Sequence, residues 1–281
     1  MMMRLVDADT ITAAVKRLCI EANCNLPNDV RGCIRLFRKQ ERWPAARDVL
    51  DKIITNFEIA GARHVPICQD TGVACVFLEI GMDAHIEGDI NAAVNEGVRQ
   101  GYREGYLRKS VVRDPLNRIN TGDNTPAMLY IDFVRGDRIT VTVAPKGFGS
   151  ENMSRIKMLR PSDGVDGVID FVVSVVEAAG PNPCPPIVVG VGLGGTFDKA
   201  ALLSKKALLR PLGDHHQQEY YANLESTLLE KINALGIGPQ GFGGAVTALQ
   251  VAIETMPTHI AGLPCAVNIN CHVTRHVSEV L

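Results

Sequence analysis

The first sixty residues place apolar side chains three and four positions apart, which is the spacing of helices that bury one face. One such stretch covers residues 11–19 and a second covers residues 30–37. Trp43-Pro44 interrupts the pattern, because proline cannot continue a helix, and a third helical stretch then runs to about Ala60. The chain is therefore predicted to begin with a helical lead-in.

A continuous apolar run at residues 73–80, closed by Gly81, predicts a buried β-strand. Asp89 follows at a position typical of a helix N-cap, with apolar residues at helical spacing after it. Two further strands are predicted at residues 128–134 and 139–144, which are rich in β-branched and aromatic residues. The four residues between them are typical of a tight turn, so we expect these two strands to form a β-hairpin.

The second half of the chain also combines both kinds of element. Its predicted helices and strands are helices at residues 165–179, 199–209 and 220–235 and strands at residues 187–195 and 266–271. No internal repeat and no linker rich in Gly and Ser separates these elements. We therefore predict an α+β fold with mixed β-sheets flanked by helices, organised as a single domain over residues 1–281.

Composition is typical of a soluble globular protein. Hydrophobic residues make up 46% of the 281 residues, and no apolar run approaches the roughly 18 residues of a membrane helix, so no membrane partner is expected. The N-terminus becomes acidic at Asp7 without an apolar stretch, which predicts no export signal and a cytoplasmic location. A net charge of -2 predicts no nucleic-acid partner. In the cytoplasm the eight cysteines are expected as packing residues, metal ligands or redox groups rather than disulfides.

Three glycines match part of a dinucleotide-binding fingerprint. Gly190, Gly192 and Gly195 satisfy G-x-G-x-x-G between a predicted strand and a predicted helix. The fingerprint also requires a second strand that ends in an acidic residue about twenty positions later. The chain instead has a polar break at residues 210–216. A nicotinamide-dependent oxidoreductase is therefore an alternative that rests on these glycines alone.

One short stretch carries four consecutive functional side chains, a thiol, an amide, a carboxylate and a hydroxyl, just before a predicted buried strand. It is Pro66-Ile67-Cys68-Gln69-Asp70-Thr71-Gly72. Two other cysteines also stand at element ends: Cys184 among three prolines before a strand, and Cys271 at the end of the last predicted strand. The alternative is that these cysteines only pack in the core and that Asp70 only caps its turn. If the three side chains converge, they supply one thiolate fewer than a fully ligated [4Fe-4S] cluster requires.

Six sequence blocks occur in order along the chain. They are Cys68-Gln69-Asp70-Thr71-Gly72, Asn120-Thr121-Gly122-Asp123-Asn124-Thr125, Lys146-Gly147-Phe148-Gly149-Ser150-Glu151-Asn152, Asn182-Pro183-Cys184-Pro185-Pro186 with Gly190-Val191-Gly192, Gly236-Ile237-Gly238-Pro239-Gln240-Gly241, and Asn270-Cys271-His272. Together they resemble the class I, iron–sulfur-dependent fumarases and the related L-tartrate dehydratases, specifically their N-terminal half or α subunit. The resemblance covers nearly the whole chain.

The resemblance implies that Cys68, Cys184 and Cys271 bind a [4Fe-4S] cluster with one labile iron that binds the substrate. Cys265 is the rival for the third ligand. Cys271 is preferred because the last ligand in this family lies just before a His or Trp and a nearby Arg, as Cys271 does here. The glycines after Val189 are then expected to allow close backbone packing.

The resemblance also implies substrate contacts by Gln69, Asp70, Arg108 and Gly149. Asp70 stands two residues after a predicted ligand, and we expect it to be the catalytic acid that exchanges a proton with the substrate hydroxyl. Lys146 and Arg275 are weaker candidates for neutralising a carboxylate.

Single-chain members of the family are considerably longer than this chain. Their proton-abstracting threonine and several carboxylate-binding Arg and Lys residues belong to a second half that this sequence does not contain. We therefore expect a hetero-oligomer in which a separate β subunit completes the site for reversible hydration of fumarate to L-malate. L-tartrate dehydration is the alternative substrate assignment, and fumarate is preferred because residues 146–157 resemble the fumarase version of that block.

Overall fold

The computed structural model describes residues 4–281. By its internal contacts the chain divides into two compact units. Unit 1 comprises the residues up to Pro27 together with Phe57–Phe148 and Arg275–Leu281, and unit 2 comprises Asn28–Asn56 and Gly149–Thr274. The expectation of a single domain over residues 1–281 stays a prediction.

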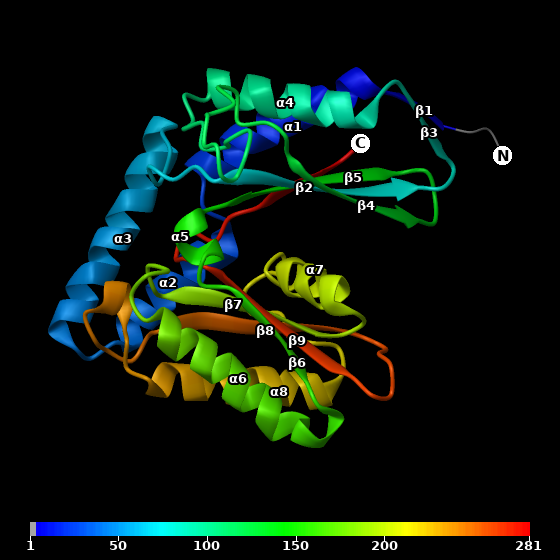
Figure 1. Ribbon diagram of the computed structural model, residues 1–281. Coiled ribbons are helices and arrows are strands. Elements are labelled where there is room, and N and C mark those ends of the chain that lie inside the picture. The colour runs from blue at the N-terminus through cyan, green and yellow to red at the C-terminus, as the bar shows by residue number, and fades with distance from the viewer. Residues whose placement is uncertain (1–3) are drawn as a thin grey trace. The chain divides into compact units, whose positions relative to one another are not determined.

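Unit 1 is a four-stranded sheet covered on one face by two helices. In spatial order its strands are β10 (Val277–Val280), β5 (Ile139–Lys146), β2 (Val73–Gly81) and β4 (Met128–Val134). The helices α1 (Ala8–Cys24) and α4 (Ile90–Glu104) lie side by side over this sheet (Figure 1). A short parallel pair, β1 (Arg4–Asp7) and β3 (Ala84–Glu87), lies beside them. Alternate residues of β2, such as Val76 and Leu78, are buried against the helices and form the core of the unit.

The predicted hairpin is wrong, because β4 and β5 do not pair with each other. Strand β2 lies between them, parallel to β4 and antiparallel to β5. Nearly every residue of β2 is buried, so this strand needs neighbours on both edges. The turn that joins β4 to β5 hydrogen-bonds with the end of β2: the Gly81 N–H donates to the Arg138 carbonyl at 2.9 Å, and the Met82 N–H donates to the Val134 carbonyl at 2.9 Å.

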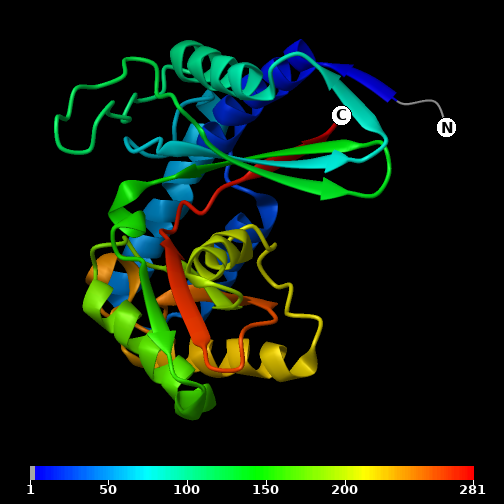
Figure 2. The ribbon, with the colours of Figure 1, turned by 45° about the vertical axis from the view of Figure 1, so that its right-hand side comes forward.

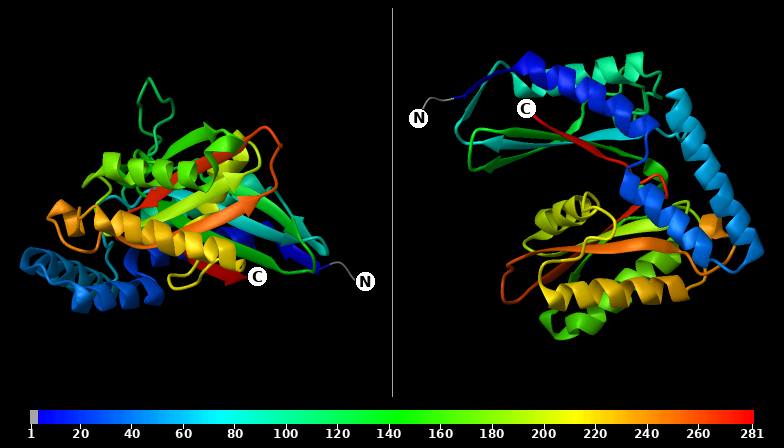
Figure 3. Two further views of the ribbon diagram at one scale, coloured as in Figure 1. Left: turned by 90° about the horizontal axis from the view of Figure 1, so that it is seen from below. Right: turned by 180° about the vertical axis from the view of Figure 1, so that it is seen from behind.

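Unit 2 is a second four-stranded sheet with helices on both faces. In spatial order its strands are β6 (Arg155–Leu159), β9 (Leu263–Asn270), β7 (Ile187–Gly194) and β8 (Ala248–Met256). Helix α7 (Phe197–Ala207) covers one face, and α6 (Gly164–Ala179) and α8 (Glu219–Ala234) cover the other (Figure 3). Strands β6 and β9 run side by side in Figure 2 and pair antiparallel. The core of the unit lies between the sheet and α6 and α8.

The glycines of β7 accommodate a helix. A Cβ atom at Gly192 would lie 2.0 Å from the Ala200 carbonyl oxygen, and one at Gly190 would lie 2.1 Å from the Ser204 carbonyl oxygen. Only glycine therefore allows the backbone of α7 to lie directly on the strand. This close packing explains the glycine pattern without a dinucleotide and gives the oxidoreductase alternative no support.

Most predicted elements are confirmed, and with them the α+β fold of mixed sheets flanked by helices. The helical lead-in corresponds to α1, α2 (Asn28–Gln40) and α3 (Pro44–Arg63). The short elements β1, β3, β6, β10 and α5 (Phe148–Glu151) were not predicted, and the apolar residues of β8 had left helix and strand open. Within residues 4–281, no helix has the length and apolar character needed to cross a membrane.

Candidate functional site

Residues 66–72, called the Cys68 turn below, join α3 to β2 in unit 1. The carboxylate of Asp70 fixes the shape of this turn. One carboxylate oxygen, Oδ1, accepts the Gly72 N–H at 3.0 Å, and the other, Oδ2, accepts the Phe148 N–H at 2.9 Å. The Asp70 N–H in turn points at the Cys68 sulfur at 3.4 Å. Cys68 and Asp70 are both half-buried. The turn therefore presents a sulfur with an amide donor beside it and a carboxylate fixed by two backbone N–H groups.

Buried polar side chains hold the same turn from within unit 1. Arg275 is only 4% exposed, and its Nη2 donates to the Asp70 carbonyl at 2.7 Å. Its Nε and Nη1 are buried without a hydrogen-bond partner among the described residues. The Tyr102 hydroxyl lies 2.9 Å from the carbonyls of Thr71 and Gly72. Because the Arg275 side chain is buried and donates to the backbone of the turn, its position suits holding the turn in place better than binding a substrate carboxylate.

The Asn120–Thr125 block supports the turn in a way that the sequence did not reveal. Asn124 is fully buried with a φ of 64°, and its side-chain amide donates to the Gly72 carbonyl at 3.2 Å. Its Oδ1 accepts the N–H groups of Ser110 and Val111 at 2.6 and 3.2 Å. One buried amide thus joins the Cys68 turn to the loop that follows Arg108. The only signal in the sequence was an Asn at a turn position that tolerates positive φ.

The predicted substrate residues of unit 1 gather at this turn. Gln69 is exposed next to Cys68. Arg108 is exposed, and its carbonyl accepts the Thr71 hydroxyl at 3.1 Å, so its backbone is fixed to the turn while its guanidinium faces outward. Lys146, in contrast, is only 5% exposed, with its Nζ 3.4 Å from the Gly147 carbonyl. Gln69, Asp70 and Arg108 therefore belong to one local arrangement.

In unit 2, strand pairing brings together two residues that are far apart in sequence. Strands β7 and β9 are antiparallel, with Val188 opposite Asn270. The start of β7 and the end of β9 therefore share one edge of the sheet, with Cys184 just before the first strand and Cys271 just after the second. The His272 N–H donates to the Cys184 carbonyl at 3.3 Å, and the His272 ring Nδ1 lies 3.0 Å from the same oxygen.

Cys271 and Cys265 differ in solvent exposure, which affects how readily a thiol becomes the thiolate that binds metal. Cys265 lies inside β9 within the hydrophobic core, fully buried, and burial raises the pKa of its thiol to about 12. Cys271 is half-buried beyond the end of the strand, and Cys184 is exposed. Since a thiolate is the form that binds metal, the surroundings of Cys271 suit a ligand and those of Cys265 do not.

Gly149, the remaining predicted substrate contact, lies in α5. It is exposed, and a Cβ atom there would have the Asn182 carbonyl, two residues before Cys184, as its nearest neighbour at 3.8 Å. Glu151 anchors the helix, accepting hydrogen bonds from Lys205 and Asn268 at 2.8 Å each. Gly149 thus lies near the segment that carries Cys184.

Cys68 belongs to unit 1, and Cys184 and Cys271 belong to unit 2. No group of three or more His, Cys, Asp or Glu side chains among residues 4–281 is arranged to hold a metal ion. The donor chemistry of these three cysteines nevertheless fits a cluster, because all three thiols lie outside the helices and strands and are partly or fully exposed. The ligand set itself stays a prediction.

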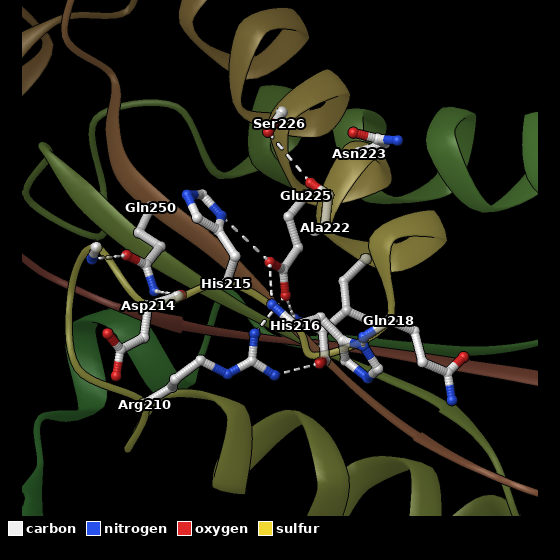
Figure 4. A network of polar contacts seen from close by, with 12 residues as sticks. Arg210, Asp214, His215, His216, Gln218, Ala222, Asn223, Glu225, Ser226 and Gln250 are labelled. Carbon is white, nitrogen blue, oxygen red and sulfur yellow. Dashed lines mark hydrogen bonds and ion pairs between the residues drawn. The ribbon is translucent and has the colours of Figure 1, made fainter.

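A separate polar network in unit 2 fixes the loop that carries His215 and His216 (Figure 4). The buried carboxylate of Glu225 pairs with Arg210 and accepts the Ile253 N–H at 2.8 Å and the His216 N–H at 3.0 Å. The His215 ring lies 3.6 Å from the same carboxylate, between Nδ1 and Oε2. The network attaches the loop to Glu225 of α8 and to Ile253 and Glu254 of β8, which indicates a structural role.

The chain matches the family model described as Fumerase, fumarate hydratase, over residues 12–280. It is 46% identical over 273 residues to a protein of Methanocaldococcus jannaschii named "Putative L(+)-tartrate dehydratase subunit alpha", which covers 94% of this chain and 95% of that relative. It is 31% identical over 269 residues to the "L(+)-tartrate dehydratase subunit alpha" of Escherichia coli strain UTI89, which covers 94% and 88% of the two chains. The similarity therefore extends over nearly the full length of both relatives.

Proposed function

Because the chain belongs to the fumarate hydratase (Fumerase) family, we propose that it is the α subunit of an iron–sulfur hydro-lyase that reversibly hydrates fumarate to L-malate. The observation that carries this proposal is the sheet edge of unit 2, where a hydrogen bond to the Cys184 carbonyl comes from the residue that follows Cys271. Such an edge supplies two ligands of the predicted set, and the Cys68 turn supplies the third. The family match over residues 12–280 gives the chemistry its class.

The residues divide the work of the reaction. Cys68, Cys184 and Cys271 hold a [4Fe-4S] cluster, which supplies a Lewis acid for the substrate oxygen through its one labile iron without a thiolate ligand. The exposed Arg108 guanidinium and the Gln69 amide bind a substrate carboxylate, and the N–H of Gly149 adds a backbone donor. These donors neutralise the negative charge that develops when the carbon next to a carboxylate loses its proton.

Asp70 transfers the proton that is exchanged with the substrate hydroxyl. Its two carboxylate oxygens are each fixed by one backbone N–H, and each retains a further lone pair for a substrate hydroxyl. In the dehydration direction Asp70 gives a proton to the departing oxygen, and in hydration it takes that proton back. Its rigid placement spares the reaction the entropic cost of orienting the acid.

A β subunit completes the site. The relatives are named as alpha subunits. A substrate dianion needs a cationic group at each of its two carboxylates, and Arg108 is the one strong candidate for such a group among the residues assigned above. We propose that the carbon base and the remaining carboxylate-binding groups come from the β subunit, so the active enzyme is a hetero-oligomer. We also propose the cytoplasm as its location, because three thiolate ligands must stay reduced.

The test is an anaerobic assay of the purified chain, reconstituted with iron and sulfide, with and without its β subunit. We expect the isolated chain to hold iron and sulfide but to hydrate fumarate negligibly, and the pair to form malate without a further cofactor. Exposure to air should abolish activity, and ferrous iron with thiol should restore it. Robust malate formation by the isolated chain would contradict the divided site, and a colourless reconstituted preparation would contradict the cluster.

L-tartrate dehydration is the second candidate, supported by the printed names of the relatives. Both substrates are four-carbon diacids, and tartrate carries one more hydroxyl than malate. A site built to bond that hydroxyl rejects the substrate that lacks it by a large factor. The ratio of kcat/KM for malate and L-tartrate, measured on the same two-subunit preparation, decides between them: a ratio above one supports fumarate hydratase, and a ratio below one supports tartrate dehydratase.

A further inference from the structure

We infer that Gln240, acting with His272, is a positioning residue that sets the spacing of Cys184 and Cys271 at the sheet edge of unit 2. Neither residue has a role in the reaction proposed above, although the inference rests on that proposal for its functional meaning. Gln240 lies in η2 (Pro239–Gly241), a short turn far in sequence from Cys184.

A closed cycle of hydrogen bonds joins the two cysteine segments through Gln240. The Gln240 N–H and its side-chain Nε2 both donate to the Pro185 carbonyl, at 2.7 and 2.8 Å. The same Nε2 lies 3.2 Å from His272 Nδ1, and the His272 ring and N–H both contact the Cys184 carbonyl. The residue after Cys184 and the residue after Cys271 are therefore tied to one side-chain amide.

The tautomer of His272 with an unprotonated Nδ1 closes the cycle, whereas a proton on Nδ1 replaces the hydrogen bond from Gln240 by one to the Cys184 carbonyl. With a proton on Nδ1, the ring donates to the Cys184 carbonyl at 3.0 Å. Without it, Nδ1 accepts the second Nε2 proton of Gln240 at 3.2 Å. The main-chain His272 N–H donates to Cys184 in both cases. The amide of Gln240 has its orientation set by the Pro185 carbonyl, which can only accept.

Backbone conformation indicates that a side chain is needed at position 240. Gln240 has a φ of 54°, a left-handed value that is strained for a non-glycine residue. Its neighbours Gly238 and Gly241 have φ values of 68° and 79°, and both are glycine. Cys184 also has a left-handed φ, of 56°. In the turn at residues 238–241, Gln240 is therefore the strained residue that is not glycine, and its side chain contacts both Pro185 and His272.

The surroundings of the cycle strengthen its hydrogen bonds. Gln240 and His272 line a pocket of about 540 Å³ together with apolar side chains of α3, Ala45, Val49 and Ile53. Pro185 is buried and Gln240 is half-buried. Hydrogen bonds in partly apolar surroundings are electrostatically stronger than in water, and breaking one leaves a costly unpaired group. Outer residues that orient metal ligands in this way typically change metal affinity about 10- to 100-fold when they are replaced.

The first test uses Gln240→Glu in the full-length chain without iron. The carboxylate has the same shape, but it places an oxygen against the Pro185 carbonyl in place of a donor. A short bifunctional thiol reagent followed by peptide mapping measures how fast Cys184 is cross-linked to Cys271. We expect Gln240→Glu to slow this cross-link several-fold, whereas Gln218→Glu, the same charge change at an exposed position, leaves it unchanged. Equal cross-linking rates in Gln240→Glu and the parent chain would overturn the inference.

The second test separates positioning from folding. In His272→Asn the amide can replace ring Nδ1 and still donate to Cys184, whereas His272→Leu cannot. We expect Asn to retain the cross-linking rate and Leu to lose it, with circular dichroism confirming that both variants fold. After reconstitution, iron affinity should fall by about 10- to 100-fold in Gln240→Glu and His272→Leu. If the parent chain takes up no cluster but the cross-linking differences persist, the inference stands and the proposed function fails.

Discussion

The Cys68 turn of unit 1 and the cysteine edge of unit 2 are built in different ways. The functional residues of the turn, Cys68 and Asp70, are near neighbours in sequence, although Arg275, which helps to fix the turn, is distant in sequence. The edge is non-local: 87 residue positions separate Cys184 from Cys271 in the numbering, and antiparallel pairing of β7 with β9 brings them together.

This difference decides which changes each region tolerates. The turn depends on individual polar groups, so single substitutions there should alter chemistry more than stability. The edge depends on the packing of a whole sheet and helix, so substitutions far from the cysteines should act on it through folding. The following predictions test this contrast, beginning with the largest expected effect.

Removing a ligand thiolate should have an all-or-none effect. Cys68→Ser, Cys184→Ser and Cys271→Ser should each bind little or no cluster, measured as iron and sulfide per chain after anaerobic reconstitution. Cys265→Ala, in the core of the same strand region, should keep the cluster and lose only packing stability, since a small cavity costs about 1 kcal/mol. A bare Cys265→Ala protein beside a Cys271→Ser protein with a full cluster would reverse the choice of third ligand.

Asp70→Asn should lower kcat by about 10²- to 10⁴-fold, the usual contribution of a positioned acid, while iron content is retained. The amide can accept only one of the two N–H groups that now bind the carboxylate, so a modest loss of stability should accompany it. The measurement is kcat, KM and iron content in one preparation with the β subunit. Loss of iron in parallel with activity would assign Asp70 to shaping the turn rather than to proton transfer.

Gly192→Ala should destabilise unit 2 by about 1–3 kcal/mol, because the added Cβ meets the Ala200 carbonyl and forces α7 away from β7. Gly32→Ala is the matched control in the same unit: its Cβ meets nothing within 4 Å, and it lies inside α2. That change should stabilise the chain by roughly 0.5–1 kcal/mol through helix propensity. Denaturant unfolding of the iron-free proteins measures both, and equal effects would show that the contact with α7 is not close.

The smallest effect concerns Asp123 and depends on pH. Partial burial alone would raise the pKa of Asp123, but the hydroxyl and N–H of Thr125 and the Arg99 guanidinium lower it to about 2. Since the unfolded value is about 3.9, this carboxylate stabilises the fold above about pH 4, and the contribution is lost as pH falls toward 2. Asp123→Asn should lower the free energy of unfolding by about 1–2 kcal/mol at pH 7, allowing for its partial exposure.

The check is a series of unfolding curves on iron-free protein from pH 7 to pH 3. The difference between the parent chain and Asp123→Asn should narrow below about pH 4, where the unfolded carboxylate becomes protonated. A difference that stays constant over this range would mean that packing rather than charge carries the effect.

The sequence alone determined the long helices, the buried strand β2 and the chemically dense turn before it. These follow from local rules: helical spacing, the N-cap at Asp89, which accepts the Ala92 N–H at 3.0 Å, and the residues that proline and glycine enclose. The family resemblance rested on the same kind of short, contiguous blocks. Substrate, partner and cluster ligands remain predictions that solution experiments can test.

Only the tertiary structure showed which segments that are distant in sequence lie next to each other. Sequence proximity favoured a hairpin of β4 with β5, yet β2 lies between them, because a strand buried on both faces is most stable in the middle of a sheet. The same kind of non-local pairing joins Cys184 to the segment after Cys271 and gives Gln240 its contacts. Residue spacing along a chain carries no record of which strand lies beside which, since that order is set by how the whole core packs.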